Sequence, residues 1–270
     1  MIRTKNEARS LGATLDAVFS QTLPPYEVLV IDSGSRDRTL LIAAGYPVRI
    51  LETGARRWSY GGALNLGVRE ASGEFIVCLS AHCPPIDRHW LQNLLRHFDD
   101  PQVAAAWGPS IPPWREPPGP EPLTIQEPGD YTILNRRWGL ENSNSALRRS
   151  LCEEVHFDES LPATEDKAWA REVMARGYRL VHDPAAAVWH RGHGVRDSFR
   201  RNRSVLAGFE AMFPELRNSS PVVPRLVALR MWRKLSWHAR QRDSAALLLD
   251  LRRGPSVLAG IVGKLLPRRP

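Results

Sequence analysis

The chain has 270 residues, 43% of them hydrophobic, and a formal net charge of +8 at pH 7. It is long enough for one large core or two small ones, and its basic balance indicates an anionic partner: nucleic acid, an anionic membrane or a phosphorylated substrate. No signal peptide and no apolar run of about 18 residues is present, so nothing in this sequence is built to cross a bilayer. The three cysteines, Cys78, Cys83 and Cys152, have no framework spacing, which fits a reduced, cytoplasmic setting.

Apolar patterns along the chain alternate between strand-like and helix-like segments. They predict helices over 8–20, 37–44, 61–71, 87–98, 148–155 and 165–176, and strands over 27–31, 48–51, 74–79, 103–107, 178–181 and 187–189, of which 27–31 and 74–79 are expected to be buried. Ser35 is the expected cap of the second helix. This alternation predicts the α/β class, with a mostly parallel sheet covered by helices on both faces.

The first strand is unusual because only Met1 and Ile2 precede the loop of residues 3–7. Such a loop normally leaves a buried strand. We therefore expect either a native start upstream of Met1 or a stub in place of a full first strand.

Two later regions differ from this pattern. Residues 108–130 are so rich in proline that we expect no regular element there, only a lid or a long insertion. Residues 225–251 have helical periodicity with many arginines, and the excess positive charge is concentrated over residues 225–270. The sequence thus predicts one domain over 1–213 and a basic helical extension over 214–270. That extension is either an interfacial helix attracted to anionic lipid or a helix packed on the domain with a solvated basic face.

The segment VLVIDSGSRDRT, residues 28–39, places an acid at the end of a buried strand. Ligands of open α/β sheets bind at such strand ends, where Asp32 could accept hydrogen bonds from a ribose or a base. The alternative is that Asp32 only caps its own loop through Gly34 and Ser35.

Five segments in order carry a family resemblance: TKNEARSL, VIDSGSRDRT, YGGALNLGVREASGEFIVCLSAHCPP, ENSNSALRRS and ATEDKAWAREVMARGYRLVHDPAAAVWH. Over residues 2–190 they resemble the family 2 inverting glycosyltransferases, which have the Rossmann-like GT-A fold. SYGGALN and LSAH are similar to bacterial rhamnosyltransferase-like members. The resemblance implies transfer of a sugar from a nucleotide-sugar donor to an acceptor hydroxyl, with inversion, in bacterial polysaccharide or glycolipid assembly.

The resemblance also implies roles for individual residues. It makes Asp166 the general base, supported by Glu165, although two acids at a helix start could merely complement the helix dipole. The positions expected to bind the donor are Thr4, Asn6, Glu7, Asp32, Ser59, Gly61, Asn65 and Ser80.

The metal-binding motif is altered, because Ser80-Ala81-His82 stands where the family usually has Asp-x-Asp. His82 and His190 are the expected ligands of a divalent cation, Mn²⁺ rather than Mg²⁺, since Mg²⁺ prefers oxygen. The alternative is a metal-free site whose histidines meet the diphosphate directly. Zinc is disfavoured, because Cys78 lies inside a strand and the cluster with Cys83 has no second pair of ligands at zinc spacing.

The resemblance implies a nucleotide-sugar donor and a glycan or lipid-linked glycan acceptor as partners. A basic tail would suit peripheral association with anionic lipid at the inner face of the plasma membrane. Nucleic acid is not an expected partner, since no recognised binding module is present. Two other functions remain: a nucleotidyltransferase, although TKNEARS lacks the expected Gly-rich basic loop, and a degenerate transferase that binds a nucleotide sugar without turnover.

Overall fold

The computed structural model describes residues 1–54, 59–113, 116–117, 122–130, 140–190 and 195–213. The chain separates into two compact units, which are described one at a time. The first comprises residues 1–160 and 165–191, and the second comprises 161–164 and 192–270. The expected domain boundary after residue 213 stays a prediction, and the predicted tail helix lies outside the described residues.

The first unit is organised around a mixed eight-stranded sheet with the order β3-β2-β1-β4-β8-β5-β9-β7. Its strands are β1 (Ile2–Thr4), β2 (Leu29–Asp32), β3 (Arg49–Glu52), β4 (Phe75–Ser80), β5 (Val103–Trp107), β7 (Thr124–Gln126), β8 (Asn144–Arg148) and β9 (Arg179–His182). The four strands β3, β2, β1 and β4 are parallel, and β8 is antiparallel to both of its neighbours. A second, two-stranded sheet pairs β6 (Ser110–Ile111) with β10 (Val188–Trp189) in parallel.

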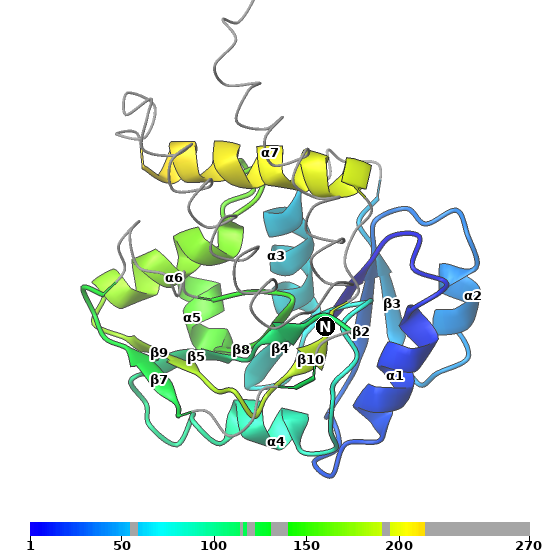
Figure 1. Ribbon diagram of the computed structural model, residues 1–270, viewed down its shortest axis with the longest axis horizontal. Helices are drawn as coiled ribbons and strands as arrows, with labels where there is room; N and C mark the ends of the chain where they lie inside the picture. Colours follow the sequence, from blue (N-terminus) through cyan, green and yellow to red (C-terminus); the bar gives the residue numbers. More distant parts are fainter. Residues whose placement is uncertain (55–58, 114–115, 118–121, 131–139, 191–194, 214–270) are drawn as a thin grey trace, which may run out of the picture. The chain divides into compact units, whose positions relative to one another are not determined.

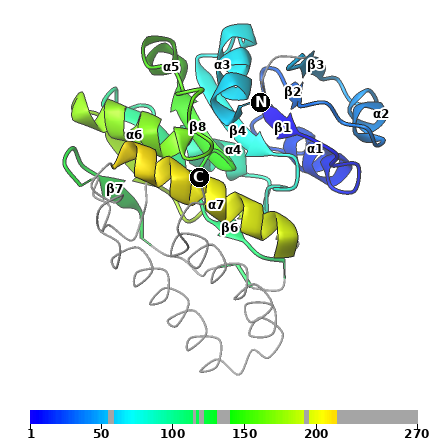
Figure 2. The same ribbon diagram turned by 90° about the horizontal axis from the view of Figure 1, so that it is seen from above.

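Helices cover both faces of the large sheet (Figures 1 and 2). One face packs on α1 (Leu11–Phe19), α2 (Thr39–Ala43) and α4 (Trp90–Leu95), and the other on α3 (Tyr60–Glu70), α5 (Arg149–Glu154) and α6 (Glu165–Ala175). Strand β4 shows why: Leu79 belongs to the first core, whereas Ile76 and Cys78 belong to the second. Alternate side chains of a strand point to opposite faces, so a strand buried on both sides reads as a continuous apolar run. The predicted α/β class is confirmed.

Three details of the sequence prediction are wrong. Regular strands form within the proline-rich region, where β6 pairs with β10 and β7 pairs with β9. Residues 144–148 form a buried central strand, which their polar sequence does not predict. Ser35 does not cap α2, whose N-cap is Arg38 without a side-chain bond, because the Ser35 hydroxyl bonds to Asp32 and to the amide of Asn6 instead.

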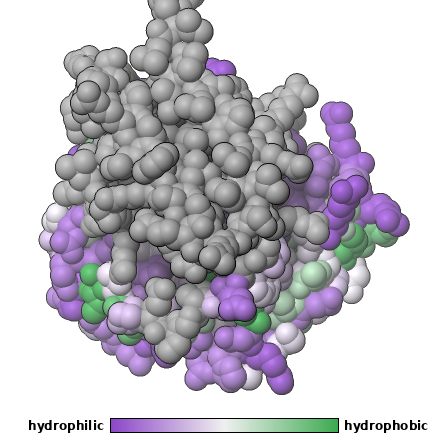
Figure 3. Space-filling model, in the orientation of Figure 1, coloured by the Kyte–Doolittle hydropathy of each residue, from purple (hydrophilic) through white to green (hydrophobic). Residues whose placement is uncertain are grey.

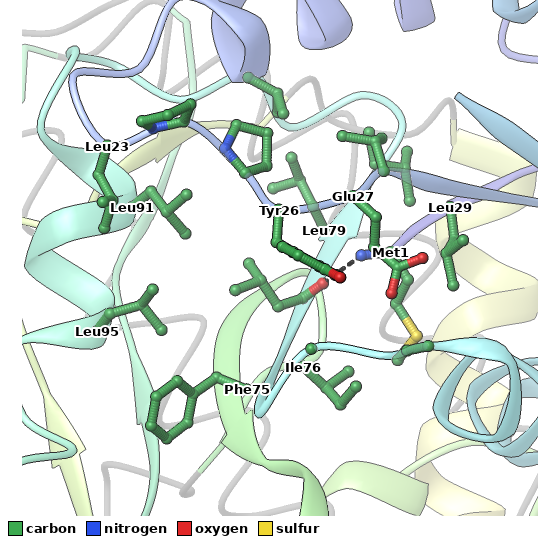
Figure 4. A pocket seen from close by; sticks show the side chains of 18 of the residues that line it. Met1, Leu23, Tyr26, Glu27, Leu29, Phe75, Ile76, Leu79, Leu91 and Leu95 are labelled. Atoms are coloured by element: carbon green, nitrogen blue, oxygen red, sulfur yellow. Dashed lines mark hydrogen bonds between the residues drawn. The ribbon is translucent and has the colours of Figure 1, made fainter. Parts of the chain in front are cut away.

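The first strand is the expected stub of three residues. Ile2 pairs with Val30 and Leu79, whereas β4 begins four residues earlier, at Phe75, so the first residues of β4 extend beyond the start of β1. An apolar cavity of about 240 Å³ lies beside these residues of β4 and is lined by Tyr26, Phe75 and others (Figure 4). The Met1 ammonium borders the cavity and donates to the Val77 carbonyl at 2.6 Å, and burial lowers the pKa of this amine. The cavity is therefore at the amino-terminal edge of the strands.

The second unit contains α7 (Val195–Met212). Within it, a Cβ on Gly208 would lie 2.2 Å from the Ala163 carbonyl oxygen, so this contact requires glycine. Among the described residues, no helix has both the length and the apolar character that a bilayer crossing demands.

Candidate active site

The predicted site residues gather where the parallel strands end. Thr4, Asp32 and Ser80 are the last residues of β1, β2 and β4, and the parallel register brings these ends to one edge of the sheet. Strand β8 runs the other way and begins at this edge, with Asn144 opposite Leu79. The carboxyl edge of an open sheet is where α/β proteins bind ligands.

Asp32 organises the loop that follows it. The side chain is fully buried, and its Oδ2 accepts from the amides of Gly34 at 2.9 Å and Ser35 at 2.8 Å. Gly34 has a φ of 82°, the left-handed conformation that glycine adopts without strain. The capping interpretation of Asp32 therefore holds in this structure, and contact with a nucleoside stays a prediction.

The loop after β1 is fastened to the loop after β2. The Asn6 amide donates to Ser35 Oγ, and Asn6 Oδ1 accepts from the Arg36 amide, both at 2.8 Å. The Glu7 amide donates to Thr39 Oγ1 at 2.8 Å. These reciprocal bonds hold Asn6 at a φ of 55° and fix Glu7 in place.

Two features of these loops favour a polar ligand. Thr4 is 4% exposed, and its hydroxyl has no partner among the residues that the structure describes. Residues 36–38 are exposed, and hydrophilic and hydrophobic side chains lie together around α2 in the space-filling view (Figure 3). A buried hydroxyl without a partner costs free energy, which a bound ligand would recover.

The loop after β4 brings together three side chains that can ligate a metal. Ligand atoms of His82, Cys83 and His190 all lie within 4.8 Å of one another. The two imidazole rings are nearly perpendicular, with centroids 5.0 Å apart. Glu7 Oε1 lies 2.9 Å from His82 Nδ1, so the carboxylate orients that ring.

A donor set of this kind fits a divalent transition metal. A carboxylate bonded to one nitrogen of a ligating histidine is the usual outer-shell arrangement, since it fixes the tautomer and leaves Nε2 to bind the ion. The expected pair of His82 and His190 is thus brought together. Cys83 joins this pair, although the ligand spacing in the sequence does not predict it.

The predicted base is tied to the same edge of the sheet. Asp166 Oδ2 accepts from the Asn142 amide at 3.1 Å, and the neighbouring Ser143 carbonyl accepts from the Ser80 amide at 3.1 Å. Buried Glu165 forms an ion pair with Arg3 at 3.4 Å. Asp166 is therefore linked to the end of β4, and Glu165 to the middle of β1.

The predicted donor residues of α3 have clear structural contacts. Ser59 caps the helix by accepting from the Gly62 amide at 3.0 Å. A Cβ on Gly61 would lie 2.7 Å from the Asp158 carbonyl oxygen. The Asn65 amide bonds both the carbonyl and the N–H of Phe157, each at 2.9 Å. Their role in donor binding stays a prediction.

Sequence reasoning did not single out Asn142, which is 1% exposed. Its side-chain nitrogen has no partner among the described residues, while its backbone amide holds Asp166. Its place in the ENSNSALRRS segment was the available signal. The sequence also offers Trp58 in the donor loop, Trp114 and Trp138 for stacking on sugar rings, and Arg191 and His193 for the diphosphate. All five lie outside the described residues.

This architecture is a fold of the GT-A type. The fold resembles the mannosyltransferase PcManGT from Pyrobaculum calidifontis, solved with GDP-Man and Mn²⁺, with a TM-score of 0.68, 21% identity, and coverage of 99% of this chain and 86% of that one. It also resembles residues 1–349 of TarS from S. aureus, solved with UDP-GlcNAc, with a TM-score of 0.57, 18% identity, and coverage of 77% and 65%.

The chain belongs to glycosyl transferase family 2, whose model matches residues 1–156, and the class of enzyme is therefore a glycosyltransferase. It is 28% identical over 219 residues to the O-antigen chain rhamnosyltransferase RfbN of Salmonella typhimurium, covering 74% of this chain and 68% of the relative. It is 29% identical over 199 residues to the O-antigen chain rhamnosyltransferase WbaN of Salmonella anatum, covering 68% and 63%. About two thirds of each relative's length is thus matched.

Proposed function

We propose that this chain transfers a sugar from a nucleoside-diphosphate donor to a glycan hydroxyl, with inversion, and that Asp166 is the general base. The observation that carries the proposal is the link between Asp166 and the end of β4 through residues 142 and 143. It joins a half-buried carboxylate to the strand end where the family binds the donor diphosphate.

The chemistry requires one proton acceptor and no protein nucleophile. The acceptor oxygen attacks the anomeric carbon, the bond from that carbon to the diphosphate breaks, and Asp166 takes the hydroxyl proton. Glu165 does not compete for this proton, because its carboxylate is buried against Arg3. Positioning and charge stabilisation then supply most of the rate.

A divalent cation fits the histidine pair, with His82 and His190 as ligands and Mn²⁺ favoured over Mg²⁺. When bound, the ion would neutralise charge on the leaving diphosphate. His82 is held for this task by Glu7, so Glu7 acts on the diphosphate site through His82 as well as through its loop.

The donor we propose is a nucleotide-activated rhamnose, and the acceptor is a lipid-linked glycan. The support is that both Salmonella relatives are O-antigen chain rhamnosyltransferases. A lipid-linked acceptor would also explain the basic residues beyond 224. They would anchor the enzyme peripherally to anionic lipid at the inner face of the plasma membrane.

A thermal-shift screen of common nucleotide sugars, each with Mn²⁺ and with chelator, tests the proposal. A donor at 100 times its Kd stabilises the folded state by about 2.7 kcal/mol. For a domain of this size that raises Tm by about 5–10 °C. No shift with any donor would contradict the proposal. Binding without turnover on any glycan acceptor would favour the degenerate, non-catalytic alternative.

A further inference from the structure

The backbone around the three metal-ligating side chains fixes their positions. His82 and Cys83 follow β4, and the Cys83 amide donates to the Ser80 carbonyl at 2.9 Å. His190 follows β10, where the Trp189 amide donates to the Pro84 carbonyl at 2.9 Å. The His190 amide itself donates to Ile111 at 2.6 Å. The two segments that carry the ligands are thus bonded directly to each other.

The surroundings of the three side chains suit a bound ion rather than solvated groups. Cys83 is fully buried, and the His82 side chain is only 14% exposed. Glu7 supplies the negative charge that orients His82, with a side chain 26% exposed. A cation here would have ordered ligands, an outer-shell carboxylate and little competing water.

We propose that Cys83 is the third protein ligand of this metal site, which is then a two-histidine, one-cysteine site for a thiophilic ion, Zn²⁺ or Co²⁺, in place of the Mn²⁺ proposed above for the histidine pair alone. Catalytic zinc sites keep three protein ligands and leave the fourth position to water or substrate. Thiolate and imidazole favour Zn²⁺ and Co²⁺, whereas Mn²⁺ stands lowest in the divalent series and Mg²⁺ prefers oxygen. The proposal deepens the proposed function, on which it rests for one point: that the open position faces the donor diphosphate.

Binding at Cys83 is an exchange without electron transfer. The S–H bond breaks, its proton passes to the buffer, and the sulfur electron pair forms the bond to the ion. Each histidine contributes a nitrogen lone pair, and the thiol supplies one released proton per ion. Metal affinity should therefore rise with pH.

Cys152 offers a matched control. Like Cys83 it is fully buried, but it lies on α5 in the core of the opposite face of the sheet. Burial raises the pKa of the Cys152 thiol well above its usual value, so it stays protonated. Cys152→Ser thus removes a buried thiol without touching the site.

The test is a Co²⁺ titration of the full, chelator-treated chain, followed by absorption spectroscopy. We expect a thiolate-to-cobalt charge-transfer band that saturates at one ion per chain. The band should be absent in Cys83→Ser and retained in Cys152→Ser. Zn²⁺ should displace the Co²⁺, whereas a large excess of Mg²⁺ should not. Affinity for Zn²⁺ should fall by about 100-fold or more in Cys83→Ser and by about 10-fold in Glu7→Gln.

A band of equal strength in Cys83→Ser, or Co²⁺ binding without a thiolate band, would overturn the proposal. If Cys83→Ser fails to fold, Cys83→Ala serves, and proton release on Zn²⁺ binding to the unaltered chain remains a second readout: none would overturn the proposal. The two proposals fail separately. A thiolate band with no turnover of any nucleotide sugar would refute the transferase proposal alone, and turnover that is complete in chelator would refute the metal site alone.

Discussion

Replacing Asp166 with asparagine should separate its chemical role from its structural one. Asp166 accepts from the Asn142 amide at 3.1 Å and from the Lys167 amide at 2.8 Å, through different oxygens. An asparagine keeps one oxygen and presents an NH₂ group to the other donor. One bond to a charged acceptor is lost, which costs about 1.5–3 kcal/mol. We expect Tm to fall by about 3–12 °C, measured by thermal unfolding.

The effect on turnover should be larger and separable. Loss of a general base lowers kcat by about 100-fold or more, or about 2.7 kcal/mol of transition-state stabilisation, with donor affinity retained. Asp100→Asn is the matched control, because Asp100 Oδ1 accepts from the Gln102 amide at 2.9 Å before β5, at the opposite edge of the sheet. It should lose stability and keep kcat. Near-normal kcat in Asp166→Asn, assayed below both melting temperatures, would remove Asp166 from the mechanism.

Three further predictions concern stability and location. Asn65→Ala removes both bonds to Phe157 and should lower the free energy of unfolding by about 2 kcal/mol in urea denaturation; an unchanged value would show that this tether contributes nothing. Burial opposes ionisation of Asp183, but bonds from His97 and Arg96 hold its pKa below the usual value, so this stability is present above about pH 4 and is lost as pH falls through the folded pKa. The loss of unfolding free energy caused by Asp183→Asn should accordingly be smaller in acid. A loss that does not depend on pH would refute the ion-pair account. Removing residues 225–270 should abolish salt-sensitive binding to anionic liposomes in co-sedimentation, since exposed charges are screened over about 8 Å; equal binding to neutral liposomes would refute the anchor.

Strand ends were predictable from the sequence because buried parallel strands leave a clear apolar run. The run before Asp32 and the run before Ser80 both end at the observed edge of the sheet. Strand β8 was not predictable, because its polar residues are buried through tertiary bonds. Asn144, fully buried, accepts from Trp90 Nε1 at 2.8 Å and donates to the Ala186 carbonyl at 2.7 Å.

Cys83 shows a second limit of sequence reasoning. Ligand spacing works when a metal site is local, but here His190 comes from a strand far along the chain. Strand β6 lies in the proline-rich region, where we expected no strand. Its pairing with β10 helps to bring His190 to the metal-ligating cluster. Asn65 and Gly61 were predicted to bind the donor, yet both also have structural contacts that hold α3 to residues 157–158.

The stereochemistry of the transfer tests the central claim most directly. With the donor selected by thermal shift and a glycan acceptor, the anomeric configuration of the new linkage can be read by proton NMR. A single displacement, with Asp166 as base, predicts inversion relative to the donor sugar and release of nucleoside diphosphate in equal amount. A product that retains the donor's configuration would contradict the account, because it requires a second displacement that this site is not proposed to perform.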